Sequence, residues 1–342
     1  MRMDRHGTAD GESPAPLRSA PLRQRAAWVD GAKGISICLV VLWHTAGIDL
    51  PLNNLLIFVR MPLFFFAAGF FSGKAINSGW RTLLADRAFN YYYIYALWMT
   101  IFFITIVVVR DTMHGAPPTF ADYFLNFIDP LEYLWFIFAL ALLFVFAKLV
   151  SPLPKPLVIG TLLIVYAISV HDGQWEPLTF QTRMERLPLF FILGGYLYPY
   201  ADTYARRLKA WWPVTLALFL AFTLLVLGQH LEYIAVLTLT ASALGLFTVC
   251  QFCQATAQTP VGAAMGFIGR NTIYIYLLHK ILIVYLVNVL EATGLSGLAG
   301  NPYLIFALVL PASLVLGLAL QRGAPWLFEA PWVLRRRGEA TA

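Results

Sequence analysis

One histidine lies within an apolar segment near the N-terminus, eleven residues after a lysine, in the stretch WVDGAKGISICLVVLWHT (28–45). At 100° per residue, this spacing places Lys33 and His44 on one face of an α-helix, about 16 Å apart along its axis. Asp30 falls within about 40° of the same face. The sequence therefore predicts an acid and a base at one end of a helical stripe and an imidazole farther along it.

The imidazole of His44 is the group in this stripe best suited to proton transfer. Histidine exchanges a proton near neutral pH, and a site of low dielectric constant favours its neutral form. His44 could therefore act as a general base. Ionisable residues within apolar segments usually face a bundle interior or a watery cavity. The alternative is that His44 hydrogen-bonds a neighbouring helix as part of the packing.

Two more charged or titratable positions lie inside apolar runs. Arg60 precedes Pro62, which frees backbone groups; the guanidinium could stabilise an oxyanion, hold an anionic group, or extend to the outer interface. His279 is followed by Lys280. It could line one cavity together with His44, or it could form a buried hydrogen bond between helices.

Two polar connections carry further candidates. Arg81 and Arg87, with Lys74, follow the second apolar run and could bind cofactor phosphates or lipid headgroups. The segment HDGQWEPLTFQTRMER contains Arg183 and Arg186 beside an aromatic residue and carboxylates. Such a mixture can bind sugar and is also ordinary for a loop at a membrane interface.

The composition indicates what must position these residues. Of 342 residues, 59% are hydrophobic and 12% are charged, and the mean hydropathy is +0.69. Soluble domains contain roughly a quarter charged residues. Apolar stretches of about 18 or more residues indicate membrane-spanning helices. We therefore expect an all-α, polytopic transmembrane helix bundle, with the lipid bilayer as its surroundings.

About ten spans are expected from the apolar runs, together with a short tail at each end. Residues 1–27 predict a disordered cytoplasmic tail, 28–322 a transmembrane domain, and 323–342 a basic cytoplasmic tail. The expected spans are 34–50, 55–73, 89–109, 132–150, 156–170, 187–200, 211–228, 231–251, 268–290 and 303–321. The fifth and sixth are short, and the segment FADYFLNFI between the third and fourth could form an interfacial helix.

The distribution of positive charge predicts the orientation of these spans. With the N-terminus inside, 19 of the 24 Lys and Arg residues fall in cytoplasmic segments and three in outside segments. Cytoplasmic loops of membrane proteins carry such an excess. Both termini are therefore expected on the cytoplasmic side, which requires an even number of spans.

Several classes of function lack their sequence signals. The chain has no nucleic-acid-binding motif, no GxSxG elbow, no Walker loop, no HExxH and no Rossmann fingerprint. Its cysteines, Cys38, Cys250 and Cys253, lie in or beside apolar runs and suit small core residues. We expect neither a metal site nor a nucleic-acid partner. Nothing in the sequence indicates an oligomeric state.

The order of these segments resembles the acyltransferase family 3 membrane proteins. The similarity begins with the basic residue, ten intervening residues and histidine at Lys33 to His44. Later blocks that resemble the family are MPLFFFAAGFFSG, LWFIFALAL, RLPLFFILGGYL and GRNTIYIYLLHKIL. The segment WRTLLADRAFNYYYIY is similar but lacks the usual proline, and Ala68 and Thr272 stand where serine is common.

The resemblance implies an integral membrane O-acyltransferase in the bacterial inner membrane. Such a protein takes an acyl group, often acetyl, from cytoplasmic acyl-CoA and delivers it to a hydroxyl of an envelope glycan, a lipid-linked glycan or another acceptor. His44 matches the catalytic histidine, with Arg60 as a second catalytic candidate. The resemblance implies that Lys33, Arg81 and Arg87 bind the cofactor. We also expect Trp135, His279 and Arg186 to bind the substrate.

Helix rise separates Lys33 from His44, so Lys33 is better placed to pair with Asp30 or meet CoA phosphates at a channel entrance. Arg60, Arg183 and Arg186 would suit an anionic acyl group or acceptor. A transporter or flippase with His44, Arg60, His279 and Lys280 along its path remains an alternative. A non-catalytic membrane partner protein is a third.

Overall fold

The protein folds as a bundle of helices. A computed structural model describes residues 27–46, 54–108, 119–130, 133–172 and 179–341. Every regular element among these residues is a helix, which confirms the all-α prediction. Residues 1–26 of the expected N-terminal tail and much of the loop before Arg183 lie outside the described residues.

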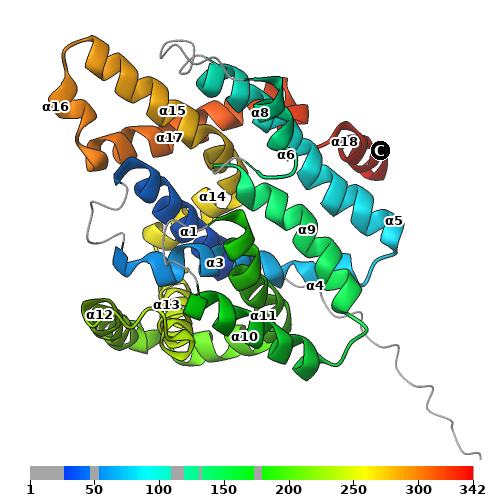
Figure 1. The fold of residues 1–342 in the computed structure, drawn as a ribbon, viewed down its shortest axis with the longest axis vertical. Coiled ribbons are helices and arrows are strands. Elements are labelled where there is room, and N and C mark those ends of the chain that lie inside the picture. Colours follow the sequence, from blue (N-terminus) through cyan, green and yellow to red (C-terminus); the bar gives the residue numbers. More distant parts are fainter. Residues whose placement is uncertain (1–26, 47–53, 109–118, 131–132, 173–178, 342) are drawn as a thin grey trace, which may run out of the picture.

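The helices follow one another with short connections (Figure 1). In the first half they are α1 (Ala27–Ala46), α3 (Ile57–Phe70), α4 (Ser72–Ile76), α5 (Trp80–Leu83), η2 (Leu84–Ala88), α6 (Phe89–Phe102), η3 (Phe103–Val108), α8 (Phe120–Leu125), α9 (Trp135–Val150) and α10 (Lys155–Asp172). In the second half they are α11 (Phe180–Arg207), η4 (Lys209–Trp211), α12 (Trp212–Gly228), α13 (Ala235–Thr256), α14 (Pro260–Arg270), α15 (Thr272–Ala292), α16 (Ser296–Ala299), α17 (Pro302–Gly323), η5 (Pro325–Leu327) and α18 (Pro331–Thr341).

A helix lies at each of the ten ranges expected to span the membrane. Among the described residues, five helical segments have the length and composition to cross a membrane: Trp80–Ile106, Lys209–Gly228, Ala235–Thr256, Thr272–Ala292 and Pro302–Gly323. Three shorter apolar helices are Ile57–Phe70, Trp135–Val150 and Lys155–His171. The helical content is therefore confirmed and several helices are candidate membrane spans, whereas the count of about ten and the orientation of the termini stay predictions.

Several helix boundaries differ from those expected. Helix α1 begins at Ala27 rather than at residue 34, so Asp30 and Lys33 lie inside it and His44 lies in its last turn. Helix α11 has 28 residues and is not the short span that was expected. The expected ninth span divides at Asn271, where α14 ends and α15 begins. The hydropathy pattern does not predict these helix ends, because polar helical turns extend beyond the apolar runs.

Helices α1, α3 and α14 lie at the centre of the bundle, between α10–α13 and the group formed by α15 and α17 (Figure 1). Glycines allow the closest crossings. A Cβ atom on Gly34 would lie 2.1 Å from the Met265 carbonyl oxygen of α14. One on Gly69 would lie 2.1 Å from the Phe191 carbonyl oxygen of α11. Small residues at such crossings let helix backbones approach in a membrane protein, so α1 and α3 are held firmly in place.

The segment expected as a C-terminal tail carries η5 and α18 and packs against η2 and α6. The Trp98 indole donates a hydrogen bond to the Leu327 carbonyl (2.6 Å), and the Ala330 amide donates to the Asn90 side chain (2.8 Å). Phe328 is buried. The basic side chains of this C-terminal segment include Arg336, which forms an ion pair with Asp86 at 2.7 Å.

Candidate active site at two adjoining cavities

His44 lines a small cavity of about 120 Å³ within the bundle. Helix α1 supplies His44, and the Tyr133 ring meets it edge-on with centroids 5.6 Å apart. The ring of His279 on α15 lies on another side, at a centroid separation of 5.1 Å. Packing of α1 against α15 therefore brings together two imidazoles that are 235 positions apart in the chain.

His279 is completely buried and is oriented by its own helix. Its Nδ1 lies 2.9 Å from the Ile275 carbonyl oxygen and 2.8 Å from that of Tyr276. Since a carbonyl oxygen only accepts, Nδ1 carries the proton that this hydrogen bond requires. The sequence suggested a hydrogen bond between helices, whereas Nδ1 of His279 bonds to carbonyl oxygens of its own helix, α15. His279 backs the ring of His44 and is not among the residues that line the cavity.

Three arginines line the same cavity as His44. Arg60 on α3 is 4% exposed, and its Cζ lies 4.0 Å from the ring centroid of Trp43. Arg186 on α11 is 3% exposed. It donates hydrogen bonds to the hydroxyl and the carbonyl of Ser169, at 3.1 and 2.5 Å. Both guanidinium groups are therefore held in fixed positions.

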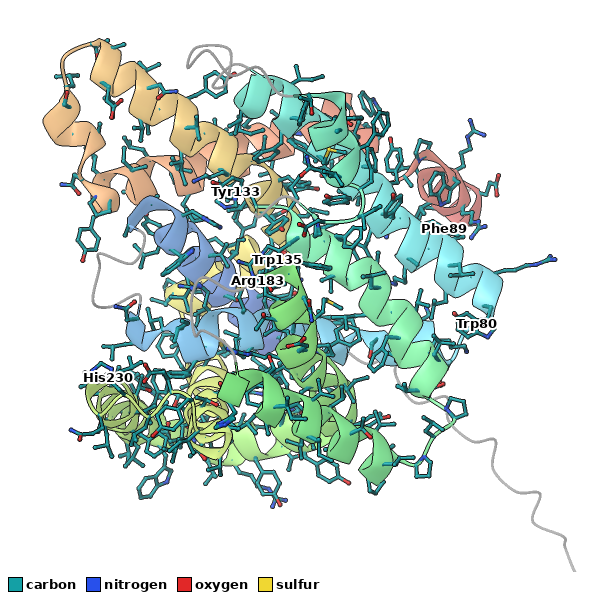
Figure 2. All side chains as sticks on the ribbon, in the orientation of Figure 1. Trp80, Phe89, Tyr133, Trp135, Arg183 and His230 are labelled. Carbon is teal, nitrogen blue, oxygen red and sulfur yellow. The ribbon has the colours of Figure 1, made fainter. Side chains whose placement is uncertain are left out.

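Arg183 is the third arginine, and it lies beside Trp135, the first residue of α9. Its Cζ is 4.6 Å from the centroid of the Trp135 ring, and both residues line the His44 cavity. Figure 2 shows them close to Tyr133 in the middle of the bundle. Lys280 lies over the Tyr133 ring at 4.4 Å. Arg60 and Arg183 line the cavity of His44, and Lys280 contacts the tyrosine that meets its ring.

A second, larger cavity of about 580 Å³ adjoins the first. Lys33 and Arg87 line it. Lys33 forms the expected ion pair with Asp30, at 3.6 Å, one helical turn away. Arg87 lies 5.6 Å from the ring centroid of Phe144. Arg81 is exposed and does not line either of these two cavities, so the two arginines predicted to act together are separated.

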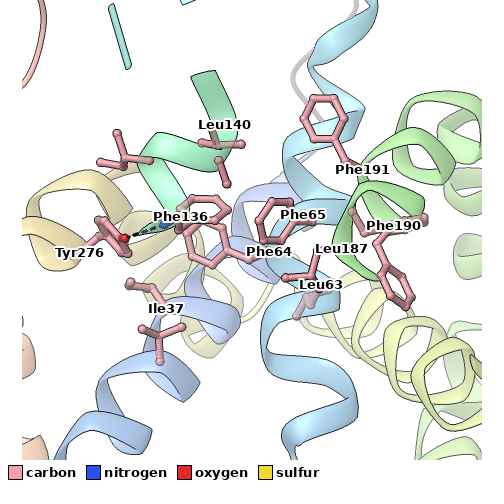
Figure 3. Close-up of a cluster of buried hydrophobic side chains, with 14 of the residues drawn as sticks. Ile37, Leu63, Phe64, Phe65, Phe136, Leu140, Leu187, Phe190, Phe191 and Tyr276 are labelled. Carbon is pink, nitrogen blue, oxygen red and sulfur yellow. Dashed lines mark hydrogen bonds between the residues drawn. The ribbon is translucent and has the colours of Figure 1, made fainter. Parts of the chain in front are cut away.

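Three aromatic residues line both cavities: Phe64 on α3, Phe136 on α9 and Tyr276 on α15 (Figure 3). The Phe64 and Phe136 rings meet edge-on at 4.4 Å, and those of Phe136 and Tyr276 at 5.7 Å. The Phe136 amide donates a hydrogen bond of 3.3 Å to the Tyr276 hydroxyl. This amide lies in the first turn of α9, where backbone donors lack intrahelical partners. We refer to these three residues as the aromatic wall.

Sequence reasoning missed the aromatic wall and its role as a boundary. Phe64 and Phe136 lie in runs rich in phenylalanine, where the sequence does not distinguish a ring that lines a cavity from one that fills the core. Tyr276 carried a weak signal, because a tyrosine hydroxyl inside an apolar run requires a partner. The partner, an amide 140 positions earlier, depends on the packing of α9 against α15.

The described residues contain no group of three or more His, Cys, Asp or Glu side chains that could hold a metal ion. Cys38, Cys250 and Cys253 are free thiols, and the last two are buried. Cys253 packs 3.2 Å from the position of a Cβ on Gly31. Cys253 thus packs against α1, as expected of a small core residue.

Comparison with known proteins assigns the family. The sequence model of a protein family, described as an acyltransferase domain, matches residues 26–322. The chain belongs to this acyltransferase family. The acyltransferase is also similar to the inner membrane protein YcfT of Escherichia coli (strain K12), with 25% identity over 295 residues. That alignment covers 77% of the acyltransferase and 81% of YcfT. No solved structure matches the acyltransferase.

The family match includes α1 to α17 and therefore both cavities and the aromatic wall. Together with its long apolar helices, it identifies the acyltransferase as a multi-pass integral membrane protein. Helix α18 lies beyond the matched residues. The residues that could do chemistry thus lie within the part of the chain that the family shares.

Proposed function

We propose that this acyltransferase is an O-acyltransferase of the inner, cytoplasmic membrane. It would move an acyl group, with acetyl as the simplest case, from acyl-CoA to a hydroxyl of an envelope glycan, a lipid-linked glycan or a related acceptor. The observation that carries this proposal is the contact, through one aromatic wall, between a large basic cavity and the cavity of His44. The inner-membrane location is supported by the name of its E. coli relative.

The larger cavity suits the donor. It is nearly five times the volume of the other, and Lys33 and Arg87 provide positive charge for the phosphates of CoA. The excess of positive charge in the expected cytoplasmic loops supports placing this cavity on the cytoplasmic side. An acyl-pantetheine arm entering there would bring its thioester toward the aromatic wall and, beyond it, His44.

The smaller cavity suits the chemistry. A hydroxyl is a poor nucleophile until a base removes its proton during attack. In direct transfer, His44 takes that proton while the hydroxyl oxygen attacks the thioester carbonyl. The C–S bond then breaks, and His44 returns the proton to the CoA sulfur. Arg60 is placed to stabilise the negative oxygen that develops on the carbonyl.

The test compares envelope glycans and lipids by mass spectrometry from cells with the gene, without it, and with His44→Gln. We expect one acyl mass to be present with the wild type and missing from the other two. An Arg335→Gln variant, altered at an exposed position on α18, should retain that mass. Immunoblots of membranes would verify equal amounts of inserted protein. Full acylation by His44→Gln would contradict the proposed mechanism.

A transporter or flippase is the second candidate, favoured by the same pair of cavities on either side of the aromatic wall. Such a protein would move a solute from one cavity to the other without consuming acyl-CoA. In proteoliposomes, it predicts saturable uptake of an envelope precursor in the absence of any acyl donor. Loss of an acyl mass from envelope material without such uptake would favour the acyltransferase.

A further inference from the structure

The C-terminal segment, Pro325–Thr341, packs onto α6 and α15, two helices whose residues also line the larger cavity. It consists of η5, α18 and the turn between them, and it lies beyond the family match at residues 26–322. The ring of Phe328 meets that of Tyr274 edge-on, with centroids 4.7 Å apart, and lies 5.9 Å from that of Trp98. The segment is therefore an ordered part of the bundle beside this cavity (Figure 1).

Two side chains of α18 bond to the residues directly before Arg87. The Trp332 indole donates a hydrogen bond of 3.0 Å to the Ala85 carbonyl, and the Arg336 guanidinium pairs with the Asp86 carboxylate at 2.7 Å. Ala85 and Asp86 belong to η2, as Arg87 does, and η2 is a π-helix. Turns of this kind are rare and occur frequently at functional sites. The contacts from α18 fix the backbone turn that carries the Arg87 side chain.

The same segment also contacts the chain after Arg87. The Ala330 amide donates a buried hydrogen bond of 2.8 Å to the side chain of Asn90, three positions beyond it. Glu329 forms an ion pair with Arg337 at 2.8 Å. Burial raises the pKa of the Glu329 carboxyl, while the charges of Arg337 and Arg87 act to lower it. The segment therefore meets η2 and its surroundings on both sides of Arg87 along the chain.

Arg87 itself faces the larger cavity. It lines this cavity together with Phe144 of α9, and its Cζ lies 5.6 Å from the centroid of the Phe144 ring. An arginine side chain has many rotamers, and ordering them on binding costs conformational entropy. A backbone that is already fixed limits the positions that the guanidinium can take. Contacts that hold η2 therefore favour phosphate binding by Arg87, although they lie away from the phosphate.

We propose that the C-terminal segment is a working part of the donor site, in which Trp332 and Arg336 are positioning residues that hold Arg87 toward the phosphates of the acyl donor. This inference rests on the proposed acyl transfer, in which acyl-CoA supplies those phosphates. It extends the donor site beyond the residues that the family match covers.

The first experiment compares the binding of two ligands by calorimetry. CoA carries phosphates, whereas pantetheine, the arm that bears its thiol, carries none. We expect the double variant Trp332→Phe, Arg336→Gln to bind CoA about threefold more weakly than the wild type and pantetheine equally well. Both altered side chains are exposed, so the variant should fold. Arg335→Gln, at an exposed position on the same helix, should bind both ligands as the wild type does.

A conservative variant and a second background assign the effect to Arg87. Arg336→Lys keeps the charge opposite Asp86 and should retain the affinity of the wild type for CoA. Arg87→Gln alone should weaken CoA binding about fivefold. In the Arg87→Gln background, the changes at Trp332 and Arg336 should add less than about 1.5-fold, because residues that act through one partner are not additive.

Three outcomes overturn the inference. The first is unchanged CoA binding by the double variant. The second is an equal loss of CoA and pantetheine binding, which indicates a general loss of packing. The third is a full additional loss in the Arg87→Gln background, which indicates a role independent of Arg87.

Comparison with the product assay separates this inference from the proposed function. If envelope material is acylated and CoA binding does not depend on the C-terminal segment, the inference alone fails. CoA binding that depends on Trp332 and Arg336 through Arg87, with no acylated product, supports the inference and contradicts the proposed acyl transfer. A wild-type protein that binds no CoA contradicts both.

Discussion

The two cavities of this protein share three aromatic residues but differ in size and charge. The larger, about 580 Å³, holds Lys33, whose charge is paired with Asp30, and Arg87. The smaller, about 120 Å³, holds His44 and three arginines. A large cavity with two basic residues suits a long, flexible molecule with phosphates at one end. A small cavity with fixed charges suits the alignment of reacting atoms. This difference indicates that the two cavities have separate roles, with donor binding in the larger and chemistry in the smaller.

The largest effect should come from a change that disrupts both cavities. Helix α1 carries Lys33 and His44, and a Cβ on Gly34 would lie 2.1 Å from the Met265 carbonyl oxygen. We expect Gly34→Leu to lower the thermal midpoint by more than about 5 °C and to abolish both CoA binding and acyl transfer. Gly73→Leu is the control, since a Cβ there meets nothing within 4 Å. Unchanged melting of Gly34→Leu would show that the crossing can relax.

A change in the smaller cavity alone should separate chemistry from binding. We expect His44→Gln to reduce kcat for acyl transfer by about 100-fold or more, because it removes the general base. The affinity for CoA, measured by calorimetry, should stay within about twofold of the wild type, a change below 0.5 kcal/mol. A large loss of CoA affinity in this variant would contradict the division of roles between the cavities.

Filling one cavity at a time sharpens the same comparison. Ala68 lines the larger cavity, and Ser242 on α13 lines the smaller. We expect Ala68→Trp to raise the donor KM about tenfold, as lost contacts of about 1.4 kcal/mol would do. Ser242→Leu should lower kcat and preserve CoA binding. If both variants changed the same kinetic constant, the cavities would act as one site.

The smallest effect concerns Arg81 and Arg87, for which the sequence predicts the same role. We expect Arg87→Gln to weaken CoA binding about fivefold, since one charge-assisted hydrogen bond at a partly exposed position is lost. Arg81→Gln should change the affinity by less than about twofold, because exposed charges contribute little. Titrations at low and high salt would show whether the difference is electrostatic. Equal losses in both variants would place Arg81 at the donor as well.

Much of the fold follows from local properties of the sequence. Apolar runs and sparse charge determine the helices, and helical periodicity determines that Lys33 and His44 share a face at different heights. The Lys33–Asp30 ion pair follows from the same periodicity and is present. Helix boundaries were less predictable, because the polar turns of α1 and α11 have no hydropathy signal.

The site itself depends on contacts between distant parts of the chain. That Arg60, Arg183 and Arg186 line one cavity with His44 follows from the packing of α1, α3 and α11. The same arginines could have lined separate sites, and sequence spacing does not distinguish one shared cavity from several. The sequence alone therefore determined the helices and the candidate base. Only the tertiary structure decided which charges surround that base and where the two cavities meet, because an aromatic or charged side chain has the same sequence pattern whether it faces lipid, a neighbouring helix or a cavity.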